Sequence, residues 1–408
     1  MQTVLIKFFS QQGITRPINL KRLALSVTPV GLGQAALLVY LPILVDITPL
    51  GYSQWAQLFA LGMLFYFVGS VLWPLLLPTL GYKRILHWSL TGFSASMALL
   101  GLGLVAWNQN WIGPVSCITV LGFSRVIYGL FASALVPACQ AGCIQLSNSD
   151  NRLKSFSTIS LYLALSRTLG PLLALVAAAL HWLGPVLVLL MFPIAILMAN
   201  RGFTYPSTVD SNAPPNQSLI ARINLKKLKA PLAFLMIAMA ATAFASSLQF
   251  MAAPILEQLL NSDSQATTQW LGALLVSAAL VTAIAHFLQS KMPPQFPTAR
   301  MVGIGFLLAA CGLGLFTQLT LGWLALMVLI ASAGLAWLTP LYSTRLSQQN
   351  PNHHEVAAQL SLSHLAGHFV GLTISAQLLE MNLSYLFGWL VVLGLLMVIA
   401  TVCWGKPT

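Results

Sequence analysis

Two arginines stand inside long apolar segments of the sequence, where a charged side chain is costly. Arg167 lies in LALSRTLGPLLALVAAAL (163–180), one helical turn before Gly170 and Pro171. Arg125 lies in a second such segment, LGFSRVIYGLFASA. Arginine cannot shed its proton in a protein, so each guanidinium needs a partner or a wet cavity. Because a guanidinium is a planar donor fork that matches carboxylate or phosphate, we predict that Arg167 clamps an anion.

A structural role stays open for each arginine. Arg167 can instead tether and close the cytoplasmic end of its helix bundle, and Arg125 can bond backbone carbonyls of a neighbouring helix. The Gly170-Pro171 pair bends or breaks the helix and lets a neighbour pack closely. An arginine one turn before such a bend can point into a central cavity.

Two histidines form another candidate site. His364 and His368 are four residues apart and therefore share one face of a helix. Imidazoles titrate near neutral pH, so they can carry protons or bind an anion. A full set of metal ligands is not visible, and no Glu lies between the two histidines to act as a base. We therefore predict no metal site and no catalytic residue, and ordinary hydrogen bonding is the alternative role.

Acidic residues are few, and most of them lie at one end of the apolar segments. Four of the seven, Asp46, Glu257, Asp263 and Glu380, stand at the ends opposite the basic loops. No carboxylate lies at mid-segment in the N-terminal half. We therefore predict an anionic or zwitterionic substrate, or proton coupling through Asp46, Glu257 and Glu380. Keeping the outer rim hydrated is the alternative role.

Aromatic residues offer walls for an amphiphilic ligand. The candidates are Tyr40, Trp55, Phe59, Tyr66, Tyr128 and Tyr162. Tyr128 is counted among the binding or coupling residues. Packing against lipid or at the membrane interface is the alternative for each of them.

The whole chain is too apolar for a soluble protein. Of its 408 residues, 58% are hydrophobic and only 6% are charged, whereas a soluble domain carries about 25% charged residues. The net charge of +12 does not indicate nucleic-acid binding, because the basic residues are scattered and form no stripe. The composition predicts an all-α polytopic protein of the lipid bilayer.

Twelve apolar segments approach or exceed the length of about 20 residues that crosses a bilayer. They are 23–46, 56–78, 85–107, 114–145, 155–180, 184–200, 231–256, 269–289, 301–318, 321–342, 356–379 and 383–404. The fourth is long, and we expect a short re-entrant or interfacial stretch at its start. With this count, every Lys and Arg outside the segments falls on one side. The positive-inside rule then places both termini and the central loop in the cytoplasm.

A polar stretch divides the chain into two halves. Residues 201–230, rich in Pro, Ser, Asn and Lys, predict a cytoplasmic linker between six-helix bundles at 1–200 and 231–408. The fifth segments of the two halves align, with Arg167 opposite His368 and Gly170 opposite Gly371. Such weak internal symmetry is typical of a duplicated transporter, and chance similarity between apolar segments is the alternative.

The chain as a whole resembles the major facilitator superfamily, and one loop carries part of the likeness. GSVLWPLLLPTLGYKRIL (69–86) resembles the family's loop between the second and third spans, which has a gating role. Gly81, Lys83 and Arg84 match that motif. Pro78 stands where the family has an acidic residue, so the charge-relay part of this role is lost from the motif.

Three span motifs extend the resemblance. Arg125 and Gly129 match the fourth-span motif, in which Arg comes four residues before Gly. Gly170 and Pro171 match the fifth-span motif associated with the antiporter branch. VYLPILVDI (39–47) resembles the first span of drug and metabolite exporters.

The resemblance implies a fold of two pseudo-symmetric six-helix bundles and a monomeric, proton-coupled transporter that works by alternating access. It also implies a role for Arg125 in proton coupling. Since the sequence has no Walker-type phosphate loop, an ion gradient is the expected energy source and no cofactor is expected. The predicted location is a bacterial inner (cytoplasmic) membrane.

The function expected from these features is export of a small organic compound, such as a drug or a siderophore. Import of a small organic anion or siderophore is the main alternative. A polytopic membrane enzyme and a transporter-like sensor are further alternatives, and a turnover assay on the purified protein would separate an enzyme from a transporter.

Overall fold

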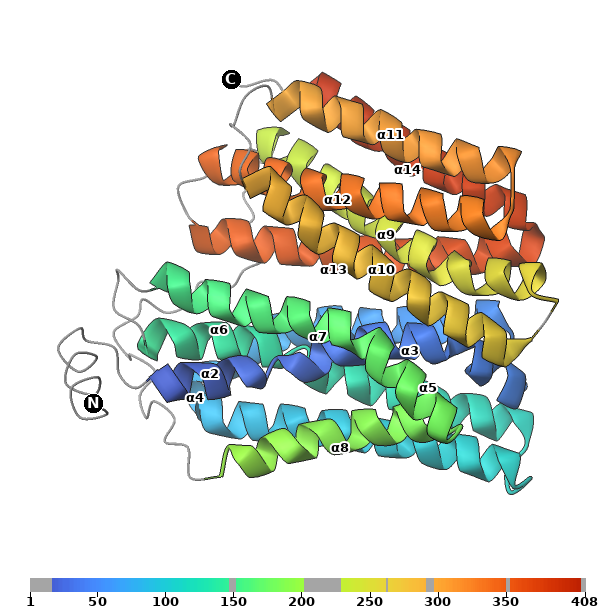
Figure 1. The fold of residues 1–408 in the computed structure, drawn as a ribbon. Coiled ribbons are helices and arrows are strands. Elements are labelled where there is room, and N and C mark those ends of the chain that lie inside the picture. Colours follow the sequence, from blue (N-terminus) through green and yellow to red (C-terminus); the bar gives the residue numbers. More distant parts are fainter. Residues whose placement is uncertain are drawn as a thin grey trace, which may run out of the picture. The chain divides into compact units, whose positions relative to one another are not determined.

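The computed structural model describes residues 17–146, 152–201, 229–261, 263–290, 297–349 and 353–404 (Figure 1). Its helices are α2 (Pro17–Leu25), α3 (Thr28–Ile47), α4 (Tyr52–Asn108), α5 (Pro114–Ala132), α6 (Leu135–Leu146), α7 (Arg152–Leu180), α8 (Gly184–Ala199), α9 (Lys229–Leu259), α10 (Ser264–Ser290), α11 (Pro297–Thr317), α12 (Leu321–Gln349), α13 (His353–Met381) and α14 (Leu383–Trp404). These described residues contain no β-strand. The predicted all-α fold is confirmed.

The helices account for the predicted membrane spans. In the described part of the chain, 10 helical segments are long and apolar enough to cross a membrane. Two further helices fall on the remaining predicted spans: α8 is apolar but has 16 residues, and α13 has 29 residues with more polar ones among them. A twelve-span polytopic fold therefore agrees with the structure.

The fourth predicted span is interrupted near its end and not at its start. Pro114 begins α5 directly, so the re-entrant or interfacial stretch expected there is wrong. Proline suits the first turn of a helix because its missing N–H would have no partner there anyway. The interruption falls at Ser133 and Ala134, between α5 and α6. Pro137 favours a break there, because it cannot donate to the carbonyl of residue 133 and crowds it.

The second and third spans meet at Gly81 within α4. Gly81 has φ 74° and ψ 157°, a backbone conformation that a residue with a side chain rarely adopts. A Cβ there would meet nothing within 4 Å. The glycine is therefore required by the backbone conformation and not by close packing.

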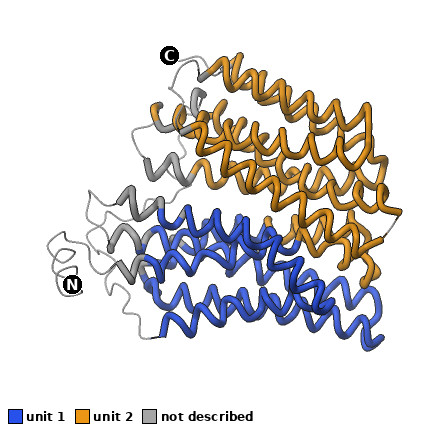
Figure 2. The backbone as a smooth tube through the Cα atoms, in the orientation of Figure 1, with its two compact units in different colours: residues 1–37, 64–219 blue, residues 38–63, 220–408 orange. Residues whose placement is uncertain are grey.

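Contacts divide the chain into two compact units (Figure 2). Unit 1 comprises residues 1–37 and 64–219, and unit 2 comprises residues 38–63 and 220–408. The end of α3 and the start of α4 thus group with the C-terminal part of the chain.

Within unit 1, small residues let α3 and α7 approach closely. A Cβ at Gly31 would overlap the Ser166 hydroxyl and crowd the Leu163 carbonyl. A Cβ at Gly170 would lie 3.0 Å from the Leu32 carbonyl oxygen. Helices in a bilayer associate through such contacts, because lipid provides no hydrophobic drive between them.

Within unit 2, the same arrangement joins α9 and α13. A Cβ at Gly367 would overlap the Met239 carbonyl, and one at Gly371 would overlap the Ser246 hydroxyl. In each half, then, the fifth span packs on the first span at the aligned glycines, Gly170 and Gly371. This equivalence supports the internal repeat.

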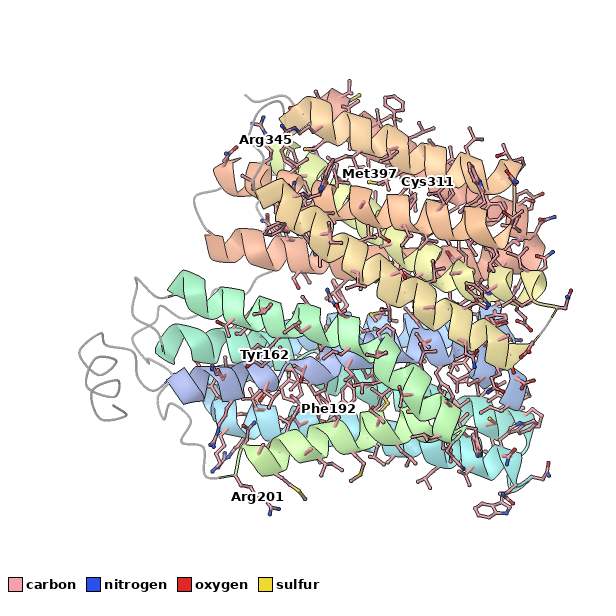
Figure 3. The ribbon with its side chains drawn as sticks, viewed as in Figure 1. Tyr162, Phe192, Arg201, Cys311, Arg345 and Met397 are labelled. Atoms are coloured by element: carbon pink, nitrogen blue, oxygen red, sulfur yellow. The ribbon has the colours of Figure 1, made fainter. Side chains whose placement is uncertain are left out.

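The other close helix pair of unit 2 is α11 with α14, which run side by side in Figure 1. A Cβ at Gly394 would crowd the backbone of Ala309. Cys311 on α11 and Met397 on α14 are both buried (Figure 3). Cys311 is a free thiol and fits the packing role expected of the cysteines.

Candidate functional site

Arg125 lies on α5 and is only 2% exposed. Its Nη2 donates a 2.9 Å hydrogen bond to Ser124 Oγ, and that hydroxyl donates to the Ser96 carbonyl at 2.9 Å. The guanidinium carbon lies 5.3 Å from the ring centroid of Tyr128, a cation–π contact. The buried Nε has no hydrogen-bond partner among the described residues. The charge is therefore met by neutral groups, and one donor is left open.

Arg167 lies on α7 and differs from Arg125 in exposure. Its side chain is exposed, whereas that of Arg125 is buried. It is close enough to Tyr66 on α4 and Tyr128 on α5 to interact with both electrostatically. Gly31 on α3 leaves room for its stem, since a Cβ there would come within 3.0 Å of Arg167 Cγ.

Tyr128 links the two arginines, because it interacts electrostatically with both. Its ring packs edge-on against Phe93 at a centroid distance of 5.4 Å. Its hydroxyl is buried, and Gln34 of α3 lies beside it without forming a hydrogen bond of ordinary geometry. Within the described chain that hydroxyl has no other partner.

These residues form what we call the arginine–tyrosine cluster. Its members are Gln34, Tyr66, Arg125, Tyr128 and Arg167, from α3, α4, α5 and α7 of unit 1. It holds two guanidinium charges, and the described residues of unit 1 include no acidic side chain. Buried charges and unsatisfied donors are costly, so the open Arg125 Nε and Tyr128 hydroxyl mark a place suited to an anion.

The sequence pointed to part of this cluster. It named Arg125, Arg167 and Tyr128 as binding or coupling residues, and Tyr66 only as a wall. Gln34 was missed, although a lone carboxamide in the apolar first span is a detectable signal. The structure shows why these residues belong together: four helices that are far apart in sequence bring them within electrostatic range.

The three carboxylates predicted to couple protons, Asp46, Glu257 and Glu380, lie around the connection between α3 and α4, within unit 2. Ser264 Oγ donates a 3.1 Å hydrogen bond to Asp46 Oδ2. The Ser53 hydroxyl donates to Glu380 Oε1. We call Asp46, Glu257 and Glu380, with their neighbours Tyr52, Ser53 and Ser264, the carboxylate cluster.

The third carboxylate of that cluster, Glu257, faces a tyrosine. The Tyr52 hydroxyl is buried beside it and also interacts with Asp46, but it forms no hydrogen bond of ordinary geometry with a described residue. Asp263 acts differently. Its Oδ1 accepts from the backbone N–H groups of Gln265 and Ala266, both at 3.0 Å, and so caps α10.

The two predicted histidines both lie on α13 in unit 2 and are half-buried. The Tyr342 hydroxyl of α12 is 2.8 Å from His364 Nε2, and the imidazole tautomer decides which group donates. Tyr342 is 1% exposed. His364 thus has a fixed orientation, which a residue that carries protons needs.

The residues predicted to gate or shape the bundle lie either exposed beside the Gly81 kink or within the helices α5 and α7. Lys83 and Arg84 are exposed beside the Gly81 kink. Gly129 is buried in α5, and Pro171 lies inside α7. The side chain of Pro78 lies outside the described residues.

Comparisons with known proteins agree on one architecture. A family model described as Major Facilitator Superfamily matches residues 23–376. A search of curated proteins gave no match.

Three solved structures share the fold at low sequence identity. A D-xylose–proton symporter is 14% identical, with a TM-score of 0.71 and 95% of each chain covered. A mutant of the nucleoside transporter NupG is 11% identical, with a TM-score of 0.73, 95% of this chain and 100% of the other covered. A bacterial homologue of the human lysosomal transporter Spinster, in an inward-facing and occupied conformation, is 15% identical, with a TM-score of 0.64 and 95% and 94% covered.

Proposed function

The chain belongs to the major facilitator superfamily, and from this premise we propose that it is a proton-coupled exporter of a small organic anion or zwitterion. Its family and its fold support a membrane-embedded secondary transporter of small molecules in preference to an enzyme. In such a transporter two six-helix bundles rock around a site near the middle of the membrane.

The arginine–tyrosine cluster carries the proposal for the substrate. Arg125 and Arg167 share Tyr128 as a neighbour, and neither has a carboxylate partner among the described residues of unit 1. A carboxylate or a phosphate would satisfy the guanidinium donors with short, charge-assisted hydrogen bonds. A drug with an acidic group and a carboxylate siderophore both fit this description.

The titratable groups of unit 2 support proton coupling. Asp46, Glu257 and Glu380 lie around the α3–α4 connection, and His364 is held by Tyr342. Proton binding at either place would change the charge next to a hydrogen bond that joins two helices. Binding of the anion in unit 1 and of protons in unit 2 is the division of roles that we propose.

The direction of transport rests on sequence motifs. Gly170 and Pro171, which resemble the antiporter motif, lie in α7 where Gly170 meets α3. Import remains the second candidate, because one protein with this fold is a D-xylose–proton symporter. We further propose a monomer in a bacterial inner membrane, with both termini and the 201–230 linker in the cytoplasm.

The test is comparative metabolomics of a deletion strain, with a complemented strain as control. We expect one anionic compound to vanish from the medium and accumulate in the cell extract. A compound that stays unused in the medium would identify an importer. A turnover assay on the purified protein distinguishes a membrane enzyme.

A further inference from the structure

The charges of unit 1 do not balance. Arg125 and Arg167 are its cations inside apolar helices, and Asp150 and Asp210 are the only acidic residues in its sequence. Those two aspartates belong to polar connections and lie outside the described residues. Inside the apolar spans, the described part of unit 1 therefore offers two permanent positive charges and no negative one.

The neutral groups around Arg125 do not replace a counter-ion. The Ser124 hydroxyl accepts a hydrogen bond from Arg125 and donates one to the Ser96 carbonyl. Tyr128 presents the face of its ring to the Arg125 guanidinium. The Nε donor of this 2% exposed side chain stays open. A hydrogen-bond acceptor brought by a ligand would complete it.

The groups around Arg167 are also neutral hydroxyls, those of Tyr66 and Tyr128. Tyr128 is 4% exposed, and its hydroxyl has no hydrogen-bond partner among the described residues. This hydroxyl interacts electrostatically with the guanidinium groups of both Arg125 and Arg167. It is placed to donate to a negative group that either arginine holds.

From these contacts we propose that the cluster binds a dianion, with one negative charge for each guanidinium. Two carboxylates on one carbon chain and a single phosphate monoester are the two chemical forms of such a ligand. A zwitterion fits poorly, because its cationic end would lie beside a guanidinium, and the described residues of unit 1 offer no carboxylate to receive it. The dianion proposal narrows the substrate class of the proposed function. It depends on the proposed function only for the claim that the bound ligand is transported.

The experiment measures binding to the purified full-length chain in detergent, without any gradient. The carboxylate arm compares succinate, butyrate and 4-aminobutyrate, which share a four-carbon chain and differ in charge. The phosphate arm compares glycerol 3-phosphate with glycerol. Thermal unfolding midpoints and calorimetry, at constant ionic strength, report the affinities.

We expect succinate or glycerol 3-phosphate to bind at least about tenfold more tightly than its matched monoanion, zwitterion or neutral control. The better-binding arm tells which form of dianion the site takes. Butyrate or 4-aminobutyrate binding as well as succinate would overturn the proposal, and so would a lack of binding by both dianions.

Three variants assign the binding to the cluster. Arg125→Gln and Arg167→Gln should each weaken dianion binding roughly 10-fold to 100-fold and remove the preference over the monoanion. Tyr128→Phe keeps the ring that packs on Phe93 and removes only the open hydroxyl, so it tests the site even if an arginine variant misfolds. Arg201→Gln is the matched control, because Arg201 is exposed at the end of α8 (Figure 3) and should leave binding unchanged.

The dianion proposal and the proposed transport function can be refuted independently. Selective dianion binding by a protein that moves nothing across proteoliposomes would refute the proposed function and leave this inference standing. Export of a monoanion or a zwitterion by the intact protein would refute this inference and leave the function standing.

Discussion

Ser53, at the start of α4, donates a hydrogen bond to the carboxylate of Glu380, at the end of α13. A parallel contact joins Ser264 of α10 to Asp46 of α3. Both contacts lie within unit 2 and fasten the connection between the first two spans. Carboxylates that were expected to couple protons are therefore the acceptors of contacts that hold this connection in place.

We predict that Glu380→Gln uncouples transport from external pH. If Glu380 carries the transported proton, the transport rate depends on the external proton concentration and falls as external pH rises. Glutamine still accepts the hydrogen bond from Ser53 but stays neutral at every pH, and its rate should be flat. The measurement is the initial transport rate in proteoliposomes over a range of external pH at fixed internal pH.

Ser53→Ala is the matched variant for that prediction. It removes the hydrogen bond and keeps the Glu380 carboxylate, so its pH profile should retain the wild-type shape while its maximal rate changes. A wild-type pH profile in Glu380→Gln would show that Glu380 only accepts the hydrogen bond from Ser53 and does not couple protons.

We predict opposite stability changes for alanine substitutions at Gly371 on α13 and at Gly388 on α14. Gly371→Ala places a methyl group against the Ser246 hydroxyl and the Ala243 carbonyl, and should cost about 1–3 kcal/mol. Gly388→Ala meets nothing within 4 Å and should stabilise the protein by about 0.4–1 kcal/mol through reduced freedom of the unfolded chain. Thermal unfolding midpoints in detergent compare the two. Equal midpoints would argue against close contact between α9 and α13.

Periodicity and composition predicted the fold better than they predicted the site. The apolar segments, the Gly170 and Gly371 pair and the Gly81 turn follow from local rules about lipid, close packing and positive φ. Arg125 and Arg167 stood out because a permanent charge in an apolar segment has no local explanation. Ser53 and Tyr342 have ordinary local surroundings. Their importance comes from partners on other helices, which a single sequence does not reveal.

The break in the fourth span shows a second limit. The segment 114–145 was long enough to suggest an extra interfacial start, whereas Pro137 breaks it near the end. The rule was available, because proline disrupts the helix about four residues before itself. The length of an apolar segment alone therefore does not locate a break within it.

His364 gives a further prediction about coupling. His364→Gln keeps a hydrogen-bonding side chain near Tyr342 and removes the titrating imidazole. We expect substrate counterflow without a gradient to persist, while proton-driven accumulation falls at least about tenfold. Tyr342→Phe removes the hydrogen bond that orients the imidazole but keeps the imidazole itself, so it should reduce proton-driven transport less than His364→Gln does. Accumulation at the wild-type level in His364→Gln would exclude His364 as the coupling group.

Arg167→Lys tests the geometry of anion binding apart from its charge. Lysine keeps the positive charge beside Tyr66 and Tyr128 but loses the planar fork that holds two oxygens at once. We expect the KM for the exported anion to rise at least about tenfold while the maximal rate changes little. Arg167→Gln should abolish transport, because it removes the charge as well. If Arg167 only closed the cytoplasmic end of the bundle, Lys would serve as well as Arg and the KM would stay the same. A KM unchanged in Lys and Gln alike would rule out anion binding by Arg167.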